Sequence, residues 1–252
     1  MARNSSVTTT NDLGTQADEA PYRVVESERR TATILELWLR PLAAPLRYRP
    51  GEYVLLEDSG HGIAPRSYSI ANAPRSDGLI SLLVTRVPDG LTSMWIHEHL
   101  RVGDDVSFSG PYGTFVDDTA SDRPCLFLAA GSGLAPVRSL IEAALSTRAH
   151  RSLTLVVSAR TEADVIDRER FTGWQASHPH FRYLRTLTRA KGPGLHGRIP
   201  AVLPSLRGEL VHHEAFIAGA PGFVIACAAA VDAAGLCLAH IHTEPFFADP
   251  GS

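Results

Sequence analysis

The chain of 252 residues is 44% hydrophobic and 20% charged, proportions typical of a globular protein with one large or two small cores. Its net charge of −3 is too small to indicate a nucleic acid or a membrane surface as partner. No apolar run approaches the roughly 20 residues that span a bilayer. Residues 1–20 are polar and lack the features of a secretory signal. We therefore expect a disordered tail over residues 1–20 and a cytoplasmic protein.

Cysteine and histidine usage supplies no complete disulfide or metal-ligand set. Cys125, Cys227 and Cys237 lie in apolar surroundings typical of buried free thiols, and their odd number argues against a disulfide framework. Three cysteines also fall short of the four ligands of a plant-type iron–sulfur cluster. His240 and His242 would share a face of a strand, but no third or fourth ligand accompanies them. We expect no metal site.

The first half of the chain, residues 21–118, has short strand-like segments separated by turns. The predicted strands include residues 33–39, 53–56 and 79–87, and turns rich in glycine, proline and aspartate separate them. One helix is predicted over residues 92–100. Several short strands at this spacing predict a small antiparallel β-barrel.

After a polar linker, residues 123–247 alternate between strands and helices. The predicted strands are residues 125–129, 153–158, 181–187, 215–219 and 239–243. The predicted helices are residues 134–145, 163–175, 199–203 and 223–234. This order predicts an α/β domain with a doubly wound parallel sheet, an architecture that binds nucleotides.

Arg66, Tyr68 and Ser69 form the first motif that indicates chemistry. In a strand, Arg66 and Tyr68 point to one face and Ser69 to the other. A guanidinium can clamp a pyrophosphate, a tyrosine ring can stack on a flat isoalloxazine, and a serine hydroxyl can reach a ring nitrogen. The alternative is an ordinary barrel strand that ends in a turn.

A second motif stands before the helix of the first half, where Gly90 precedes Leu91, Thr92 and Ser93. Glycine permits close approach of the backbone, and the free N–H groups of a helix start bind phosphate. The alternative is a plain helix cap.

Two glycine-rich turns in the second half each follow a strand and precede a helix, where parallel sheets bind dinucleotides. They contain Gly131, Ser132, Gly133, Ala135 and Pro136 in the first turn, and Gly219, Ala220 and Pro221 in the second. The first turn lacks the third glycine of the GxGxxG fingerprint, and such turns occur in many α/β proteins.

The strand predicted over residues 153–158 ends at Ser158 and is followed by Arg160, with Arg168 and Arg170 nearby. An acidic residue at this place usually holds the ribose hydroxyls of NADH, whereas serine and arginine suit a 2′-phosphate. This pattern favours NADPH, with NADH as the other coenzyme considered. The alternative is a set of solvated surface arginines.

The order of these motifs resembles that of the ferredoxin–NADP reductase superfamily over residues 22–247. Arg66, Tyr68 and Ser69 match its flavin motif, and residues 90–93 match its FAD pyrophosphate site. Residues 110–115 look like the turn that closes its barrel, and residues 131–136 like its nicotinamide-nucleotide loop. Glu244 and Phe246 look like its C-terminal carboxylate and aromatic residue.

The resemblance implies a role for each matching residue. Val84 and Thr85 would flank the flavin, and Ser69 and Glu244 would lie near the reacting flavin and nicotinamide. Phe246 or Phe247 would cover the flavin face that the nicotinamide must reach. Tyr68 in place of phenylalanine favours bound FAD over loose flavin use. One departure is Ala218, where the family often has a cysteine close to the nicotinamide.

The resemblance therefore implies a flavoprotein reductase that takes hydride from NAD(P)H onto FAD. The sequence shows no iron–sulfur or haem segment, so electrons would pass to a separate ferredoxin, Rieske protein, oxygenase or cytochrome P450. Two alternatives stay open. One is a reductase of small acceptors such as quinones or free flavin, and the other is a non-catalytic module that binds FAD and nucleotide.

Overall fold

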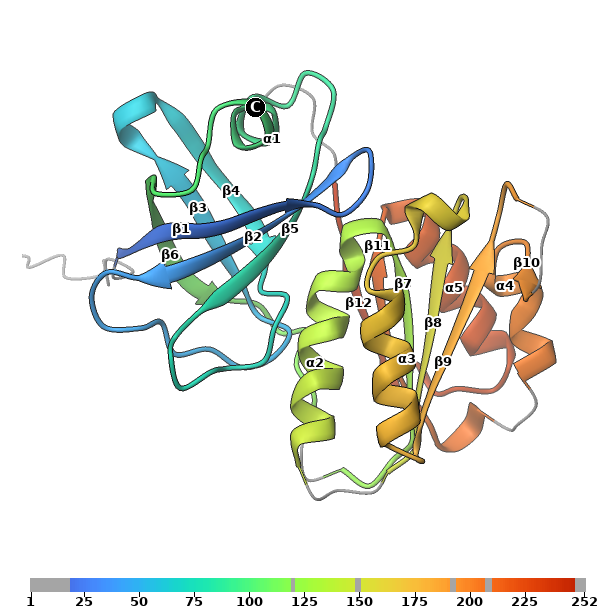
Figure 1. Cartoon of the computed structure of the whole chain (residues 1–252). Coiled ribbons are helices and arrows are strands. Elements are labelled where there is room, and N and C mark those ends of the chain that lie inside the picture. Colours follow the sequence, from blue (N-terminus) through green and yellow to red (C-terminus); the bar gives the residue numbers. More distant parts are fainter. Residues whose placement is uncertain (1–18, 119–120, 148–150, 191–193, 207–209, 248–252) are drawn as a thin grey trace, which may run out of the picture.

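The computed structural model describes residues 19–118, 121–147, 151–190, 194–206 and 210–247. Nearly all of the tail expected over residues 1–20 lies outside the described residues. Two sheets account for the fold, one built before residue 113 and one after residue 124 (Figure 1). No helix among the described residues is long and apolar enough to cross a membrane.

The first sheet is an antiparallel barrel of six strands in the order β4-β3-β6-β1-β2-β5. Its strands are β1 (Ala20–Arg29), β2 (Ile34–Pro41), β3 (Tyr53–Asp58), β4 (Ile63–Ser69), β5 (Ile80–Thr85) and β6 (Asp105–Tyr112). A bridge between Ile70 and Leu82 brings the end of β4 to β5 and nearly closes the barrel. Helix α1 (Leu91–Glu98) follows β5.

Strands β2 and β5 are buried on both faces, and this explains their nearly continuous apolar sequence. Because side chains alternate along a strand, Leu35, Leu37 and Leu39 fill the barrel core. Ile34 and Glu36 point the other way and are also buried. Their cover is the second half of the chain, which packs against this outer face of the barrel.

The second sheet is parallel, with strands in the order β10-β9-β8-β7-β11-β12. Its strands are β7 (Cys125–Ala130), β8 (Leu153–Ala159), β9 (Phe181–Leu187), β10 (Leu195–His196), β11 (Glu214–Gly219) and β12 (Ile241–Pro245). Helices α2 (Leu134–Ser146) and α3 (Arg168–Ser177) cover one face, and α4 (Ile199–Val202) and α5 (Pro221–Ala233) cover the other (Figure 1). The predicted barrel and doubly wound sheet are confirmed.

Several predicted boundaries differ from the structure, and two of these differences have a clear local cause. The helix expected over residues 163–175 begins only at Arg168, because Asp167 adopts a left-handed conformation with φ 56°. A separate turn, Glu162–Asp164, precedes it and is closed by a capping box from Thr161 to Asp164. The last strand, expected over residues 239–243, is shifted to Ile241–Pro245 by a 3₁₀ turn over Leu238–His240.

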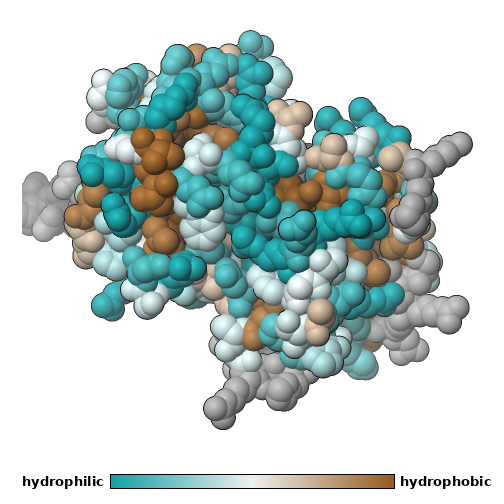
Figure 2. All heavy atoms as spheres, in the orientation of Figure 1, coloured by the Kyte–Doolittle hydropathy of each residue, from teal (hydrophilic) through white to brown (hydrophobic). Residues whose placement is uncertain are grey.

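The two halves share one buried apolar cluster. Ile34, Ala71 and Leu83 of the barrel half belong to the same cluster as Leu134 and Ala135 of α2. Helix α2 and the turn that precedes it accordingly lie next to the barrel (Figure 1). Elsewhere, the face of the molecule seen in Figure 2 is largely hydrophilic, with an apolar strip over the barrel half.

Candidate functional site

A hydrogen bond between Ser69 and Glu244 joins the two halves of the chain. The Ser69 hydroxyl donates to Glu244 Oε1 at 2.8 Å, although the residues are 175 positions apart. Ser69 is the last residue of β4, and Glu244 lies in β12 opposite Ala218 of β11. The structure thus brings together two of the predicted catalytic residues, one from the flavin motif and one from the C-terminal segment.

The Glu244 carboxyl group is buried and only partly satisfied. Its Oε2 atom has no hydrogen-bond partner among the described residues. Burial raises the pKa of Glu244 to about 7, and the hydrogen bond from Ser69 opposes that rise only in part. A carboxyl group with a pKa near neutrality and an open acceptor atom is typical of a reaction centre.

A second polar contact joins the halves at the nucleotide loop. The Thr85 hydroxyl, at the end of β5, donates to Ser132 Oγ at 2.8 Å. Ser132 lies in the 3₁₀ turn Gly131–Gly133 between β7 and α2. The strand predicted to flank the flavin therefore ends against the turn predicted to bind the nicotinamide nucleotide.

The two glycine-rich turns of the second sheet touch each other. A Cβ atom at Gly133 would lie 2.3 Å from the Ala218 carbonyl oxygen, so no larger residue fits there without movement. The Phe246 amide donates to the Gly219 carbonyl at 2.8 Å and fixes the C-terminal segment beside these turns. Phe246 is half-buried, whereas Phe247 is 76% exposed.

The residues that follow these turns open two helices. Ala135 and Pro136 are buried in the first turn of α2. Ala220 is the N-cap of α5, and Pro221 is its first residue, a position where proline is favoured.

The start of α1 offers backbone amides rather than side chains. Gly90 is its N-cap, and no side chain caps the helix. The Thr92 hydroxyl donates to the Ala64 carbonyl at 3.2 Å, and the Ser93 hydroxyl donates to the Gly90 carbonyl at 3.0 Å. The Thr92 hydroxyl therefore anchors the helix to β4 and the Ser93 hydroxyl closes its first turn, while the amides of that turn, including that of exposed Leu91, remain suited to phosphate.

Arg66 and Tyr68 lie on β4, as the flavin motif requires. Tyr68 is partly buried and packs against the barrel core, and this burial raises the pKa of its hydroxyl. The Val84 side chain is fully buried in the same core, and its carbonyl accepts a hydrogen bond from His97 Nε2 at 3.0 Å. Val84 can therefore contact a cofactor only through its backbone.

These observations fit FAD and a nicotinamide nucleotide. The uncapped start of α1 suits the pyrophosphate, and the orphaned Oε2 atom of Glu244 lies beside Ser69 at the end of the flavin strand. Two family models cover most of the chain: an oxidoreductase FAD-binding domain matches residues 23–116, and an oxidoreductase NAD-binding domain matches residues 127–229.

Known proteins similar to this chain are reductases of oxygenase systems. The ferredoxin–NAD(P)⁺ reductase component of the naphthalene 1,2-dioxygenase/salicylate 5-hydroxylase systems of Ralstonia sp. is 32% identical, over 90% of this chain and 70% of that protein. The reductase subunit of an aromatic O-demethylase from Amycolatopsis sp. is 33% identical, over 86% of this chain and 69% of that protein. This chain belongs to the ferredoxin–NADP reductase superfamily.

Solved structures of the superfamily have the same fold. The Amycolatopsis cytochrome P450 reductase GcoB superposes with a TM-score of 0.86 at 28% identity, over 92% of this chain and 71% of that one. The ferredoxin reductase of carbazole 1,9a-dioxygenase superposes with a TM-score of 0.81 at 26% identity, over 91% and 70% of the two chains. The chain is accordingly an NAD(P)H-dependent flavoprotein oxidoreductase.

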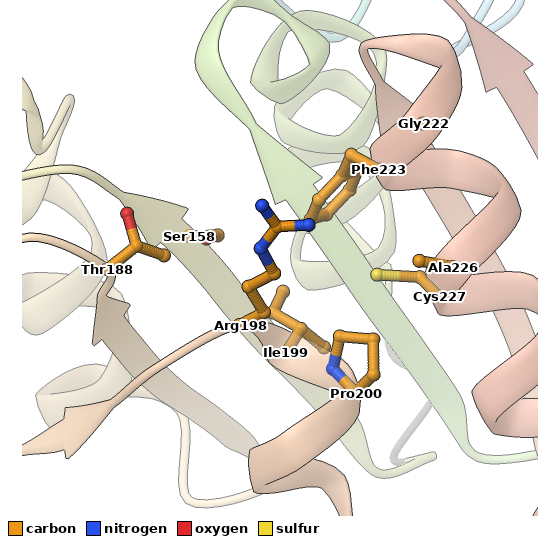
Figure 3. Close-up of a pocket in the computed structure, with 9 residues that line it drawn as sticks. All are labelled: Ser158, Thr188, Arg198, Ile199, Pro200, Gly222, Phe223, Ala226 and Cys227. Carbon is orange, nitrogen blue, oxygen red and sulfur yellow. The ribbon is translucent and has the colours of Figure 1, made fainter.

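A small pocket at the carboxyl ends of the parallel strands contains an arginine that the sequence analysis missed. Figure 3 shows the Arg198 guanidinium reaching into this pocket beside Phe223. Ser158, from the end of β8, and Thr188 line the same pocket. Arg198 precedes α4, and its position after Gly197 at a predicted helix start was the available signal.

The other arginines predicted for the coenzyme have different surroundings. Arg160 is exposed. Arg168 is exposed and lies 3.8 Å from Glu162, and Arg170 lies 3.7 Å from Asp167. The structure therefore places Ser158 in the pocket and gives two of the three arginines acidic partners.

One group of possible metal ligands occurs in the described residues. Atoms of Asp117, Cys125 and Glu214 lie within 4.8 Å of one another at the amino ends of β7 and β11. The guanidinium of buried Arg151 pairs with Asp117, so a cation already occupies this corner. Burial raises the pKa of Cys125 to about 12, which opposes the thiolate that a metal requires. We assign no metal to it.

Proposed function

We propose that this reductase carries out hydride transfer at the Ser69–Glu244 pair and then passes electrons to a separate redox protein. The hydrogen bond between these residues is the observation that carries the proposal, because it joins the flavin strand to the C-terminal segment. FAD supplies the chemistry, since it accepts two electrons as hydride and can release them singly. The protein supplies orientation, charge and exclusion of water.

The residues divide this work according to their positions. Arg66 and the amides at the start of α1 would hold the FAD pyrophosphate, and Tyr68 would pack on the isoalloxazine. Ser69 would orient Glu244 and the flavin edge. As hydride leaves, the nicotinamide ring gains positive charge, and the Glu244 carboxylate would stabilise that charge. Half-buried Phe246 would cover the flavin until the nicotinamide displaces it.

We also propose that NADPH is preferred over NADH. The pocket lined by Ser158, Thr188 and Arg198 has two hydroxyls and a permanent cation on a largely apolar wall, and no carboxylate is among its lining residues. A guanidinium can bind a 2′-phosphate with charge-assisted hydrogen bonds, whereas an NADH site usually presents an acidic side chain there. Arg198 accordingly joins Ser158 as the main support for this preference, and the roles expected for Arg160 and Arg168 stay predictions.

The acceptor that we propose is a ferredoxin, a Rieske protein, an oxygenase or a cytochrome P450. The similar proteins include reductases named for dioxygenase, demethylase and P450 systems. Cys125 and Cys227 are buried free thiols, whereas Cys237 is free but exposed, not buried as expected; free thiols accord with the reducing cytoplasmic setting that we propose.

An acceptor screen tests this function. The FAD-loaded protein is supplied with NADPH, and turnover is compared for a ferredoxin, ferricyanide, a soluble quinone, free FMN and oxygen. We expect the one-electron acceptors to give the fastest turnover. Fastest turnover with quinone or free flavin would identify a reductase of small acceptors, and absence of flavin bleaching would identify a non-catalytic module.

A further inference from the structure

A buried arginine of α2 makes contacts with both halves of the molecule. Arg138 is 0% exposed, and its guanidinium donates in four directions. Its acceptors are the Ala71 carbonyl, Asp167 Oδ2 at 2.6 Å, Glu36 Oε1 at 2.7 Å and Ser81 Oγ at 2.9 Å. Ala71, Glu36 and Ser81 belong to the barrel half, and Asp167 stands directly before α3.

A second cation completes the group, which we call the Arg138 network: Arg138, Glu36, Ser81, Asp167 and Arg30. Arg30 lies between β1 and β2 and approaches Asp167 Oδ1 at 3.0 Å and Glu36 Oε2 at 3.6 Å. Both carboxylates are buried; Glu36 faces the guanidinium groups of Arg138 and Arg30, and Asp167 faces these two and that of Arg170. Burial disfavours the ionised form of Asp167, but the positive charge of Arg138 and Arg170 outweighs it and holds the pKa of Asp167 below its usual value.

Two further side chains of α2 bind the same stretch of the barrel half. The Ser139 hydroxyl donates to the Asn72 carbonyl at 2.7 Å, and Glu142 Oε2 accepts from the Ala73 amide at 2.8 Å. With the contact from Arg138 to Ala71, one face of α2 binds three consecutive residues. Those residues begin two positions after Ser69, the end of the flavin strand.

The same helix also carries the nucleotide loop. Gly133 is the N-cap of α2, and Arg138 lies five residues later, about 7.5 Å along the axis at 1.5 Å per residue. Glu36 and Ser81 hold the other side of the guanidinium on β2 and β5, and β5 ends at Thr85 against Ser132. The Arg138 network thus connects the flavin strands to the nicotinamide loop through one rigid helix.

We propose that Arg138 is a positioning residue that sets the alignment of the nicotinamide loop against the flavin strands during hydride transfer. This inference rests on the proposed function. The apolar cluster holds the two halves together but does not fix their relative orientation. The planar guanidinium of Arg138 can donate to its four acceptors in only one arrangement of the two halves. Hydride transfer needs that precision, because misplacement by about 1 Å can cost on the order of 100-fold in rate.

The energetics of buried charges support a role in alignment. A buried ion pair seldom stabilises a protein more than apolar residues of the same size, because both charges lose their hydration. An arginine on the apolar face of α2 is therefore poorly explained by stability alone. Fixed geometry between two packed surfaces is the property that it adds.

The test compares Arg138→Lys and Glu36→Gln with the parent and with a control, Arg151→Lys. Lysine keeps the charge but cannot bridge four acceptors, and glutamine keeps the shape of Glu36 but removes its charge. Arg151 is a matched control because its side chain is 6% exposed and pairs with Asp117, which has no contact with the Arg138 network among the described residues. All variants are measured for FAD content, thermal midpoint and the limiting rate of flavin reduction by NADPH.

A fourth measurement reports alignment directly. When nicotinamide stacks on reduced flavin, a long-wavelength charge-transfer absorbance appears, and its intensity depends on the geometry of stacking. We expect Arg138→Lys and Glu36→Gln to retain FAD, to lose at least half of this absorbance at saturating nucleotide and to reduce flavin about tenfold more slowly or worse. Arg151→Lys should lower the thermal midpoint without changing either signal.

Unchanged absorbance and unchanged limiting rates in both test variants would overturn the proposal, even if both lose stability. If Arg138→Lys fails to fold, Glu36→Gln alone decides. If the parent itself is not reduced by NADPH, the proposed function fails instead. The charge-transfer absorbance, read with chemically reduced flavin and NADP⁺, then still tests the network: an absorbance unchanged by both substitutions would refute the role in alignment, and a loss of absorbance would support it.

Discussion

Replacement of Glu244 by glutamine should make the protein more stable and less active at the same time. Burial raises the pKa of Glu244 from 4.5 to about 7, a shift of roughly 2.5 units or about 3 kcal/mol at 1.36 kcal/mol per unit. Between these two pH values the folded state binds more protons than the unfolded state, so stability falls as pH rises. The stabilising effect of the raised pKa is full below pH 4.5 and is lost as pH rises through about 7.

Glutamine removes this dependence because it does not ionise. Its amide group can still accept from Ser69, but its N–H groups gain no evident partner, at a cost of about 1 kcal/mol. Glu244→Gln should therefore raise the free energy of unfolding by about 2 kcal/mol at pH 8 and lower it by roughly 0.5 kcal/mol at pH 4.5, where only the cost of the unpartnered amide remains. Urea denaturation at the two pH values, with FAD content matched, measures this difference.

The kinetic arm uses the same variant. The parent's rate constant for flavin reduction should rise with pH around an apparent pKa of about 7, as the carboxylate forms. Glu244→Gln should show no such inflection and should resemble the parent at low pH, at least about tenfold slower than the parent at pH 8. An equal rate at pH 8, or a pH profile that keeps its inflection, would refute the role given to Glu244.

Three other substitutions test the rest of the site. Arg66→Ala should weaken FAD binding roughly 10- to 150-fold, since a charge-assisted contact contributes about 1.5–3 kcal/mol; equal FAD retention on dialysis would contradict this. Arg198→Ala should reduce the ratio of kcat/KM for NADPH over NADH by at least about tenfold. Arg160→Ala should reduce this ratio less. A ratio unchanged in Arg198→Ala would show that the pocket does not bind the 2′-phosphate. Gly133→Ala should raise KM for NADPH and lower the thermal midpoint, because its Cβ atom would lie 2.3 Å from the Ala218 carbonyl oxygen. Wild-type values for both quantities would show that the two turns can move apart without cost.

The barrel and the parallel sheet could be predicted because the spacing of apolar residues along a short segment shows which of its side chains are buried. The strand over Phe181–Leu187 and the strand-to-helix turns around Gly131 and Gly219 follow from patterns within a few residues. Asp167 shows the limit of that approach. A left-handed aspartate is rare, and it delays the start of α3 because its carboxylate is drawn to Arg138 and Arg30.

The contacts between the two halves were beyond the reach of sequence patterns. Arg138 lies 102 residues from Glu36 and 67 from Ala71, and no periodicity links such positions. The only feature of the sequence that pointed to these contacts was Arg138 itself, a charged residue among the apolar residues of the helix predicted over residues 134–145. Ser69 and Glu244 were paired in advance only through a family resemblance, and their 2.8 Å hydrogen bond adds the geometry.

Anaerobic double-mixing stopped flow tests the central claim most directly. The FAD-loaded protein is first mixed with one equivalent of NADPH and then with an oxidised ferredoxin, while flavin and ferredoxin absorbance are followed together. We expect bleaching of the flavin in the first mix and, in the second, reoxidation of the flavin matched by reduction of two ferredoxins per flavin. A flavin that NADPH leaves oxidised, or a reduced flavin that yields electrons to oxygen or quinone but not to any one-electron carrier, would contradict it.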